Sequence, residues 1–454
     1  MLRPIVAIAI LLWASLARAQ DAHTWKAGVA KVKITPEKLM WMSGYGARDK
    51  PAEGKLTDLW AKALALEDAK GRRGLLITMD LVGIDRGLSL EVCAELKKKH
   101  GLPREAIILS VSHTHCGPVV RSNLNVMYDL DETQQKYVAE YAALLKQRLI
   151  EVADAAVKEL QPARLSWGIG QATFAVNRRN NIEKDVPKLR AAGKLKGPVD
   201  HDVPVLAVRD RDDKVLAVAF GYACHATVLS FYQWCGDYPG YAQAELEKMY
   251  PGATALFWAG CGGDQNPLPR RSVELAKVYG AELADAVKRV LGAPMSPLGP
   301  GFAATYTEVP LRFAELPARE KLAEDVLSKN KTVARRAGLL LARLDKEGAL
   351  TATYPYPIQI WRLDATLVWI ALGGEVVVDY ALRLKREASP GRTWIMGYAN
   401  DVMAYIPSLR VLKEGGYEGG GAMVFYGLPT VWGPRVEEMI VAAVHERAKQ
   451  IRQR

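Results

Sequence analysis

The sequence contains no internal repeat, no low-complexity tract and no long linker rich in serine or proline. These absences exclude a fibrous repeat protein and a disordered chain. Of the 454 residues, 49% are hydrophobic and 24% are charged. This balance is typical of a folded globular protein and excludes a membrane protein with several spans.

Basic stretches with interleaved aromatic residues, which would follow a phosphate backbone, are also absent. Lys and Arg number 61 against 50 Asp and Glu, which gives a formal net charge of +11. Much of the excess lies in stretches that read as helices, at 97–99 and 447–454. We interpret these as solvated helix faces. They argue against a nucleic-acid partner and allow only a weak association with an anionic membrane surface.

Cysteine is scarce. Five cysteines allow at most two disulfides and leave one thiol over. A chain of this length builds a hydrophobic core without such cross-links, so we predict no particular bridge. The five are Cys93, Cys116, Cys224, Cys235 and Cys261.

Residues 1–19 are typical of a signal peptide. Arg3 precedes an apolar run at 5–12, and Ala17 and Ala19 are small residues at the positions that signal peptidase reads. The run is too short for a stable membrane span, although a retained N-terminal anchor is the alternative. We expect cleavage near Ala19 and an exported mature chain, periplasmic or secreted. Cleavage removes Arg3 and Arg18, which lowers the net charge from +11 to +9.

A recurring pattern predicts the fold. In six places a short apolar run leads to a turn, usually with glycine, and then to polar residues. Continuous apolar runs of this length suit strands that are buried on both faces. The runs lie at 75–79, 106–111, 215–224, 255–259, 366–372 and 393–396.

Helical patterns separate these runs and favour one large α/β domain, with a mixed, largely buried sheet flanked by helices. In such sheets ligands bind beyond the carboxyl ends of the strands, so we expect the active site there. A charged helical stretch at 318–346 is a candidate cap or lid. The other helical patterns lie at 88–100, 133–160, 241–249, 273–291 and 436–452.

Only seven histidines occur, and three of them follow predicted strands. His113 and His115 are two residues apart, so in extended backbone both rings point to the same side. His225 follows another predicted strand, and Glu375 follows a glycine pair that allows a tight turn. Two imidazoles from different strands plus a carboxylate are a usual ligand set for catalytic Zn²⁺. The pattern predicts a metal site, although each histidine taken alone also suits a hydrogen-bonded core position.

Several motifs occur in a fixed order. Residues 112–118 read Ser-His-Thr-His-Cys-Gly-Pro, and 263–267 read Gly-Asp-Gln-Asn-Pro. Others, besides His225, lie at 30–36, 43–46, 177–179, 374–375 and 400–405. In this order they resemble the neutral/alkaline (non-lysosomal) ceramidases, with their His-Thr-His-Ser-Gly-Pro, Gly-Asp-Val-Ser-Pro and Asn-x-Tyr-x-x-Tyr segments. The resemblance spans 28–417. It implies one catalytic domain at 20–454, without the family's C-terminal immunoglobulin-like domain.

The resemblance also implies an activity, which is zinc-dependent hydrolysis of an amide by zinc-activated water. The implied substrate is an N-acyl sphingolipid such as ceramide, or a related small-molecule or lipid amide. His115, Arg178, Tyr417 and the Gly44 loop would contact the polar group of the substrate. The implied zinc ligands are His113, His225, Glu375 and Tyr405.

Asn266 departs from the family pattern, which has serine at this position. A hydroxyl is a potential nucleophile, whereas a carboxamide only forms hydrogen bonds, so a mechanism that needs the serine is excluded. Attack by zinc-bound hydroxide stays available, because the metal lowers the pKa of its water to about 7. Asn266 would then orient the substrate or stabilise an oxyanion. Asp80 and Asp264, both at predicted strand ends, would either orient the histidines or cap the following helices and turns.

Three other interpretations are open. The lost serine and the lost C-terminal domain prompt the first, a zinc-dependent esterase or amidase with a different substrate. The second is a cysteine nucleophile at Cys116 or Cys224, which is disfavoured because neighbours on a strand point to opposite sides. The third is a non-catalytic envelope binding protein, which predicts an incomplete set of metal ligands.

Overall fold

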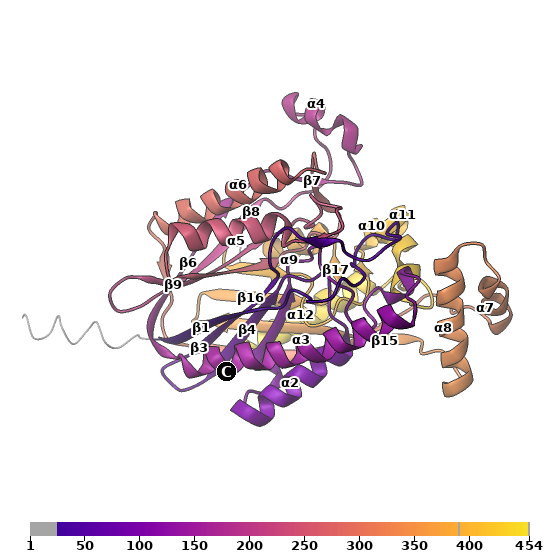
Figure 1. Ribbon diagram of the computed structural model, residues 1–454. Coiled ribbons are helices and arrows are strands. Elements are labelled where there is room, and N and C mark those ends of the chain that lie inside the picture. The colour runs from indigo at the N-terminus through magenta and orange to yellow at the C-terminus, as the bar shows by residue number, and fades with distance from the viewer. Residues whose placement is uncertain (1–24, 389–390, 453–454) are drawn as a thin grey trace, which may run out of the picture.

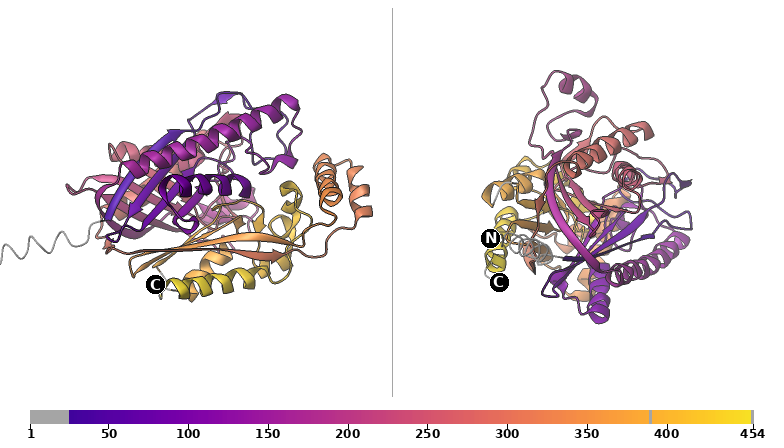
Figure 2. Two further views of the ribbon diagram at one scale, coloured as in Figure 1. Left: turned by 90° about the horizontal axis from the view of Figure 1, so that it is seen from below. Right: turned by 90° about the vertical axis from the view of Figure 1, so that its left-hand side faces the viewer.

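Two β-sheets pack face to face, and helices cover the outer face of each sheet (Figures 1 and 2). The computed structural model describes residues 25–388 and 391–452, so the predicted signal peptide lies outside the described residues. The layers confirm the predicted α/β class, with a large mixed sheet flanked by helices. The second sheet was not foreseen as a separate layer.

The larger sheet has nine strands and is mixed. The pairs β4–β5 and β9–β11 are parallel, whereas its other pairs are antiparallel. The sheet twists so far that edge strand β11 lies against β3, β4 and β5. In spatial order the strands are β11 (Thr254–Ala259), β9 (Val215–Tyr222), β8 (Asp202–Arg209), β6 (Gln161–Gln171), β1 (Trp25–Lys33), β3 (Trp60–Glu67), β4 (Arg73–Met79) and β5 (Ile107–Val111), with β13 (Ser296–Pro297) beside β6.

Four helices cover one face of this sheet and enclose the largest hydrophobic core. Their ends follow ordinary capping rules. Asp85 accepts a hydrogen bond from Leu88 N at the start of α2, which ends at Gly101 in the left-handed conformation. Asp131 and Ser272 cap α3 and α6 in the same way. The helices are α2 (Arg86–His100), α3 (Glu132–Lys158), α5 (Asp237–Met249) and α6 (Val273–Leu291).

The second sheet lies between the larger sheet and two helices, as the left view of Figure 2 shows with α3 and α12 on opposite outer faces. Its side chains alternate along each strand. Trp369 faces the larger sheet, and its neighbour Ile370 faces the helices. The strands are β14 (Phe302–Arg312), β15 (Thr353–Leu363), β16 (Leu367–Leu372) and β18 (Thr393–Met396), and the helices are α9 (Val378–Glu387) and α12 (Val436–Arg452).

Two helical excursions project from this body (Figure 1). The first, with η3 (Glu183–Asp185) and α4 (Val186–Ala191), joins β7 (Ala175–Asn177) to β8. The second is the hairpin of α7 (Arg319–Val326) and α8 (Lys331–Glu347). This hairpin is the predicted cap or lid, and it contacts η2 (Asn125–Met127) and η4 (Gly421–Tyr426) at the side of the molecule.

Short elements complete the description. Within the described part of the chain, no helix combines the length and apolar character that a membrane span needs. The remaining elements are β2 (Gly54–Lys55), β10 (Gln233–Trp234), β12 (Gln265–Pro267), β17 (Glu375–Val376), β19 (Tyr405–Ile406), η1 (Arg104–Ala106), α10 (Leu409–Glu414) and α11 (Gly416–Gly419).

Candidate metal centre

The predicted metal ligands come from both sheets and meet where strands end. His113 follows β5 and His225 follows β9, and a parallel bridge between Thr114 and Ala226 brings the two loops together. Glu375 and Tyr405 begin two short strands, β17 and β19, which pair in parallel with these two residues in register. The site therefore lies at the carboxyl ends of strands, as the apolar runs predict.

The backbone around His113 differs from the sequence-based expectation. We expected extended backbone at 113–115, but β5 ends at Val111 and His113 has a φ of 59°. This left-handed conformation is costly for a non-glycine residue and is concentrated at functional sites. The two rings still meet, because the Nε2 atoms of His113 and His115 lie 3.1 Å apart.

Backbone carbonyls fix the tautomers of two histidines. His113 Nδ1 lies 2.6 Å from the carbonyl oxygen of Val82, and His225 Nδ1 lies 2.7 Å from that of Gly262. Because a carbonyl oxygen only accepts hydrogen bonds, each Nδ1 carries the proton and donates. Each Nε2 therefore keeps its lone pair and points it into the site, as a metal-binding imidazole does.

These lone pairs converge on one carboxylate oxygen. Glu375 Oε2 lies 3.1 Å from His113 Nε2 and 3.0 Å from His225 Nε2. Glu375 is 3% exposed, and Oε2 has no hydrogen-bond partner among the described residues. Tyr405 Oη lies 3.0 Å from His225 Nε2. Ligands about 2.0 Å from a tetrahedral Zn²⁺ are about 3.3 Å from one another, so these three distances are compatible with such an ion.

The charges in the site suit a cation. Burial and then the Arg178 charge lower the pKa of His225 to about 4, so this imidazole is neutral at pH 7. Burial also lowers the pKa of His115 well below its usual range, and His113 and His225 lower it further. Burial alone would raise the pKa of Glu375, and a proton on Nε2 of either adjacent histidine would hold it well below its usual range. Neutral imidazoles beside an ionised carboxylate are the forms that bind Zn²⁺.

His115 lies closer to the metal ligands than its predicted substrate-binding role requires. The potential ligand atoms of His113, His115 and His225 all lie within 4.8 Å of one another, and all three residues are buried. The Gly44 loop packs on this ring. A Cβ atom on Gly44, whose φ is 102°, would lie 2.4 Å from His115 Nδ1.

The other predicted site residues surround Tyr405. Arg178 Nη2 donates a hydrogen bond of 3.1 Å to Tyr405 Oη, and Nη1 donates one of 3.2 Å to Asn266 Oδ1. Asn266 lies on β12, which pairs with β7 and so brings Asn266 beside Arg178. The Tyr417 ring lies 5.2 Å from the Tyr405 ring, centroid to centroid. The structure thus brings all eight predicted site residues into one cluster.

Sequence reasoning missed two residues that hold this cluster. Tyr426 donates a short hydrogen bond to Glu375 Oε1, the carboxylate oxygen that does not face the histidines. Arg48, which is 6% exposed, donates to the carbonyl oxygens of Ser43 at 2.5 Å and His115 at 2.7 Å. Neither lies at a predicted strand end, so the strand-end pattern could not have found them.

Two other sequence-based alternatives are settled by contacts. Asp264 accepts from Val378 N, at the start of α9, and from Asn177 Nδ2, so it ties β7 to that helix. Asp80 accepts from Trp60 N. Asp264 therefore acts at the start of a helix and Asp80 at the start of β3, and backbone carbonyls orient His113 and His225 instead. All five cysteines are free and buried. Burial raises the pKa of Cys116 and Cys224 well above the usual range, which gives no support to a thiolate nucleophile.

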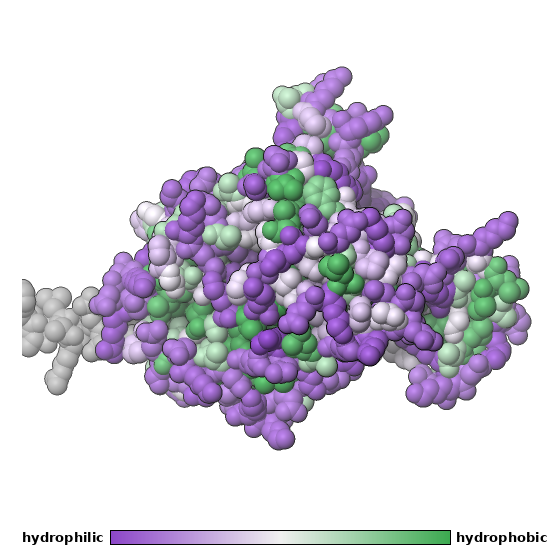
Figure 3. Space-filling model, viewed as in Figure 1, coloured by the Kyte–Doolittle hydropathy of each residue, from purple (hydrophilic) through white to green (hydrophobic). Residues whose placement is uncertain are grey.

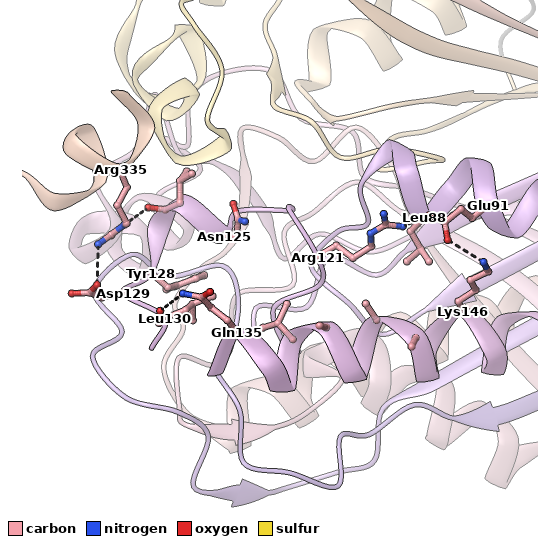
Figure 4. A pocket seen from close by; sticks show the side chains of 15 residues that line it. Leu88, Glu91, Arg121, Asn125, Tyr128, Asp129, Leu130, Gln135, Lys146 and Arg335 are labelled. Atoms are coloured by element: carbon pink, nitrogen blue, oxygen red, sulfur yellow. Dashed lines mark hydrogen bonds and ion pairs between the residues drawn. The ribbon is translucent and has the colours of Figure 1, made fainter. Parts of the chain in front are cut away.

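A cleft of about 700 Å³ opens beside the metal centre. It is lined by three of the predicted site residues, Arg178, Asn266 and Tyr417, and by residues of the projecting α4 excursion. Another cleft, of about 880 Å³, lies between α2, α3 and α8 (Figure 4). None of the predicted site residues lines that second cleft. The first cleft is therefore the one that reaches the predicted site residues.

Comparisons with known proteins point to one family. The family model described as "Neutral/alkaline non-lysosomal ceramidase, N-terminal" matches residues 25–267. The chain is 29% identical over 230 residues to the neutral ceramidase of Pseudomonas aeruginosa, a match that covers 49% of this chain and 33% of that protein. It is 27% identical over 263 residues to the neutral ceramidase of Drosophila melanogaster, which covers 54% and 36% respectively. The matches thus span about a third of the length of these curated relatives.

Solved structures show the same fold. The crystal structure of neutral ceramidase from Pseudomonas aeruginosa superposes with a TM-score of 0.70 at 21% identity, over 94% of this chain and 75% of that one. A structure described as ceramidase complexed with C2 has a TM-score of 0.70 at 22% identity, over 93% and 76%. The family model matches more than half of the length of this chain, so the chain belongs to the neutral/alkaline non-lysosomal ceramidase family.

Proposed function

We propose that the protein is a zinc-dependent hydrolase that cleaves a linear amide bond, with a ceramide-like N-acyl lipid amide as its substrate class. The observation that carries the proposal is Glu375 Oε2, a buried carboxylate oxygen with no hydrogen-bond donor among the described residues that faces two imidazole lone pairs. A bound cation would give the carboxylate oxygen and the two imidazole lone pairs a common partner. Membership in the ceramidase family supports an amide as the substrate.

The residues that would hold zinc are His113, His225, Glu375 and Tyr405. When bound, zinc supplies a Lewis acid and lowers the pKa of water to about 7. Burial raises the pKa of the Tyr405 hydroxyl well above its usual range, and Arg178, which donates to its oxygen, acts in the opposite direction. His115 stays as an alternative ligand, because its Nε2 lies in the same group of atoms.

The remaining residues bind and orient the substrate. The Arg178 guanidinium and the Asn266 amide line the cleft and supply hydrogen-bond donors for charge that develops on a carbonyl oxygen. Arg178 donates to Asn266 Oδ1, so the Asn266 Nδ2 hydrogens are directed elsewhere. Tyr417 is 44% exposed at the rim and offers an aromatic face to an entering chain.

The second candidate is a zinc-dependent esterase, or an amidase on a non-ceramide substrate. The lining of the cleft favours it, because most of the lining residues are polar or charged, with only Ile182, Leu268 and Tyr417 offering large apolar surface. A non-catalytic binding protein is the less favoured reading, since all four candidate metal ligands are present in one buried cluster.

We also propose export and a weak association with anionic membranes. Four exposed lysines on the α4 excursion lie beside the cleft, and none has an ion pair among the described residues (Figure 3 shows this projecting part as largely hydrophilic). Each basic residue near an anionic lipid surface contributes about 1 kcal/mol. They are Lys184, Lys188, Lys194 and Lys196.

Vesicle co-sedimentation tests this association. Changing the four lysines to serine should abolish binding to vesicles with about 30% phosphatidylglycerol, in about 0.1 M salt. Unchanged binding would contradict the assignment. The matched control replaces four exposed lysines elsewhere, Lys97, Lys98, Lys136 and Lys277.

An activity screen tests the proposed reaction. Zinc-loaded protein is assayed on N-acyl amino alcohols of short and long chain and on the matching esters. We expect amide cleavage that a chelator abolishes and that His225→Ala lowers by at least about 10³-fold. His445→Ala is the control, because the His445 side chain on α12 is 43% exposed and pairs with Glu387. Chelator-resistant hydrolysis would contradict the zinc mechanism, and cleavage of esters alone would favour the second candidate.

A further inference from the structure

A buried glutamate beside the metal centre has no role in the proposed function so far. Glu418 lies on α11, in the glycine-rich stretch 415–421, and is 5% exposed. Its neighbour Tyr417 reaches the Tyr405 ring. A carboxylate this deeply buried needs charged partners, because the cost of removing it from water is several kcal/mol.

Two consecutive arginines supply those partners. Arg178 Nε lies 2.7 Å from Glu418 Oε1, and Arg179 Nη1 lies 2.6 Å from Glu418 Oε2. Within the described ranges, Glu418 is the only carboxylate in ion-pair distance of Arg178. The glutamate therefore fixes one edge of the guanidinium that faces the metal centre.

The other nitrogens of Arg178 are directed at the site. Nη2 donates to Tyr405 and Nη1 to Asn266, while Nε is held by Glu418. With Nε anchored, the planar guanidinium has one orientation in which Nη1 and Nη2 reach these two oxygens. Without the anchor, the side chain can rotate away from Tyr405.

A second glutamate nearby serves as a comparison that tests whether Glu418 has a purely structural role. Glu414 on α10 binds Arg179 Nη2 at 3.0 Å and Arg410 Nη1 at 3.0 Å, and it is 42% exposed. It ties this segment to Arg179, one of the two consecutive arginines, but does not touch Arg178. Substituting Glu414 therefore measures only the effect of loosening this segment.

We propose that Glu418 is a positioning residue that holds the Arg178 guanidinium against Tyr405 and Asn266, and that it acts on the reaction only through Arg178. This inference rests on the proposed amide hydrolysis. It assigns the glycine-rich stretch 415–421 a function, which is to deliver one carboxylate to the back of the Arg178 side chain.

A double-mutant cycle tests the proposal. Glu418→Gln should lower kcat by about 10- to 100-fold, with KM and zinc content within about twofold of the wild type. Glu418→Asp keeps the charge and should recover part of kcat. Glu414→Gln should stay within about twofold of the wild type. In the Arg178→Ala background, Glu418→Gln should cost nothing further.

Additive losses in the double variant, or equal losses for Glu414→Gln and Glu418→Gln, would overturn the proposal. Thermal unfolding of each variant separates loss of folding from loss of positioning, and Glu418→Asp serves if Glu418→Gln does not fold. A second readout keeps the test independent of turnover. Octanoate carries a carboxylate that the Arg178 guanidinium can bind, so its affinity, measured by calorimetry, should weaken at least about tenfold in Glu418→Gln and not in Glu414→Gln. If the wild type hydrolyses nothing, the proposed function fails, and equal octanoate affinities would overturn the role of Glu418 itself.

Discussion

A buried carboxylate oxygen ordinarily accepts a hydrogen bond, and Glu375 Oε2 has no donor among the residues that the structure describes. Its polar neighbours, Nε2 of His113 and of His225, are acceptors because each Nδ1 donates to a carbonyl. A proton on His225 Nε2 would supply the missing hydrogen-bond donor. Burial, however, lowers the pKa of that ring to about 4, so Nε2 carries no proton at pH 7. A divalent cation satisfies all three atoms at once, which supports the proposed zinc site.

The hydroxyl of Tyr426 orients Glu375 for this role. In the Tyr426→Phe variant the carboxylate loses its donor at Oε1, while the ring and its packing stay. We expect a zinc affinity about 10-fold lower with little change in thermal stability of the metal-free protein, because partners of metal ligands are worth about 10- to 100-fold. Competition with a chromogenic chelator measures the affinity.

Tyr380→Phe is the matched control. This tyrosine is also fully buried, and its hydroxyl donates to the carbonyl oxygen of Pro407 instead of a metal ligand. Equal losses of zinc affinity in the two variants would show that the hydroxyl of Tyr426 has no special connection to the metal.

Asp401 should make stability depend on pH. Burial raises its pKa to about 7, against a partial lowering by the Tyr354 hydroxyl; Asp85 and Glu308 raise it further, and Arg86 lowers it. Between pH 4 and 7 the unfolded chain ionises this carboxyl while the folded chain keeps it protonated. The folded state therefore loses stability as pH rises through this window and loses no more above it.

The Asp401→Asn variant has no carboxyl group at this position, so it lacks this pH-dependent loss of stability. Relative to the wild type, the variant should gain stability from pH 4 to pH 8, by no more than about 4 kcal/mol. Urea unfolding at several pH values measures the difference. A difference that does not vary with pH would contradict the raised pKa.

At the scale of elements, the Gly44 loop fits His115 only because glycine has no side chain. In Gly44→Ala the new Cβ would lie 2.4 Å from His115 Nδ1 in a backbone with φ of 102°. We expect a stability loss of about 1–2 kcal/mol and a fall in activity of at least about tenfold. Hydrolysis rates and thermal unfolding measure the two effects.

Gly71→Ala separates the two causes. Gly71 also has a positive φ, of 75°, but no atom lies within 4 Å of the position that a Cβ would take there. The Gly71→Ala variant should therefore lose stability and keep its activity. If the Gly44→Ala variant also kept full activity, the close approach of Gly44 to His115 would not matter for function.

The sequence was sufficient to predict most elements and to name site residues that the structure brings into one cluster. The apolar runs before Asp80, His113 and His225 are strands because only buried strands need such uninterrupted apolar side chains. The left-handed backbone of His113 was not predictable, since it depends on the Thr114–Ala226 bridge to a distant loop. Tyr426 was missed because it reaches Glu375 from a 3₁₀ turn with no periodic pattern.

At the scale of the whole molecule, the metal centre depends on the contact between the sheets. His113 and His225 follow strands of the larger sheet, whereas Glu375 and Tyr405 belong to segments associated with the second sheet. No local pattern shows that β11 turns back onto β5, because this closure comes from twist that accumulates over many strands. A single domain at 20–454 stays a prediction.

Trp369 tests this dependence. It is fully buried between the sheets, 5.3 Å from each of the Trp258 and Trp394 rings. Trp369→Ala should lower the free energy of unfolding by about 3–5 kcal/mol and weaken zinc binding with it. Leu327→Ala, at a side chain that is 84% exposed on the α7–α8 hairpin, should change it by less than about 0.5 kcal/mol. Similar urea midpoints for the two variants would contradict the importance of the contact between the sheets.

The most direct test of the metal centre is the zinc content of the purified protein, measured by elemental analysis after dialysis against metal-free buffer. The wild type and the His445→Ala control should carry about one zinc ion per chain, and Glu375→Ala should carry almost none while it remains folded. A wild type without stoichiometric zinc after exposure to the ion, or a Glu375→Ala variant that keeps it, would contradict the assignment.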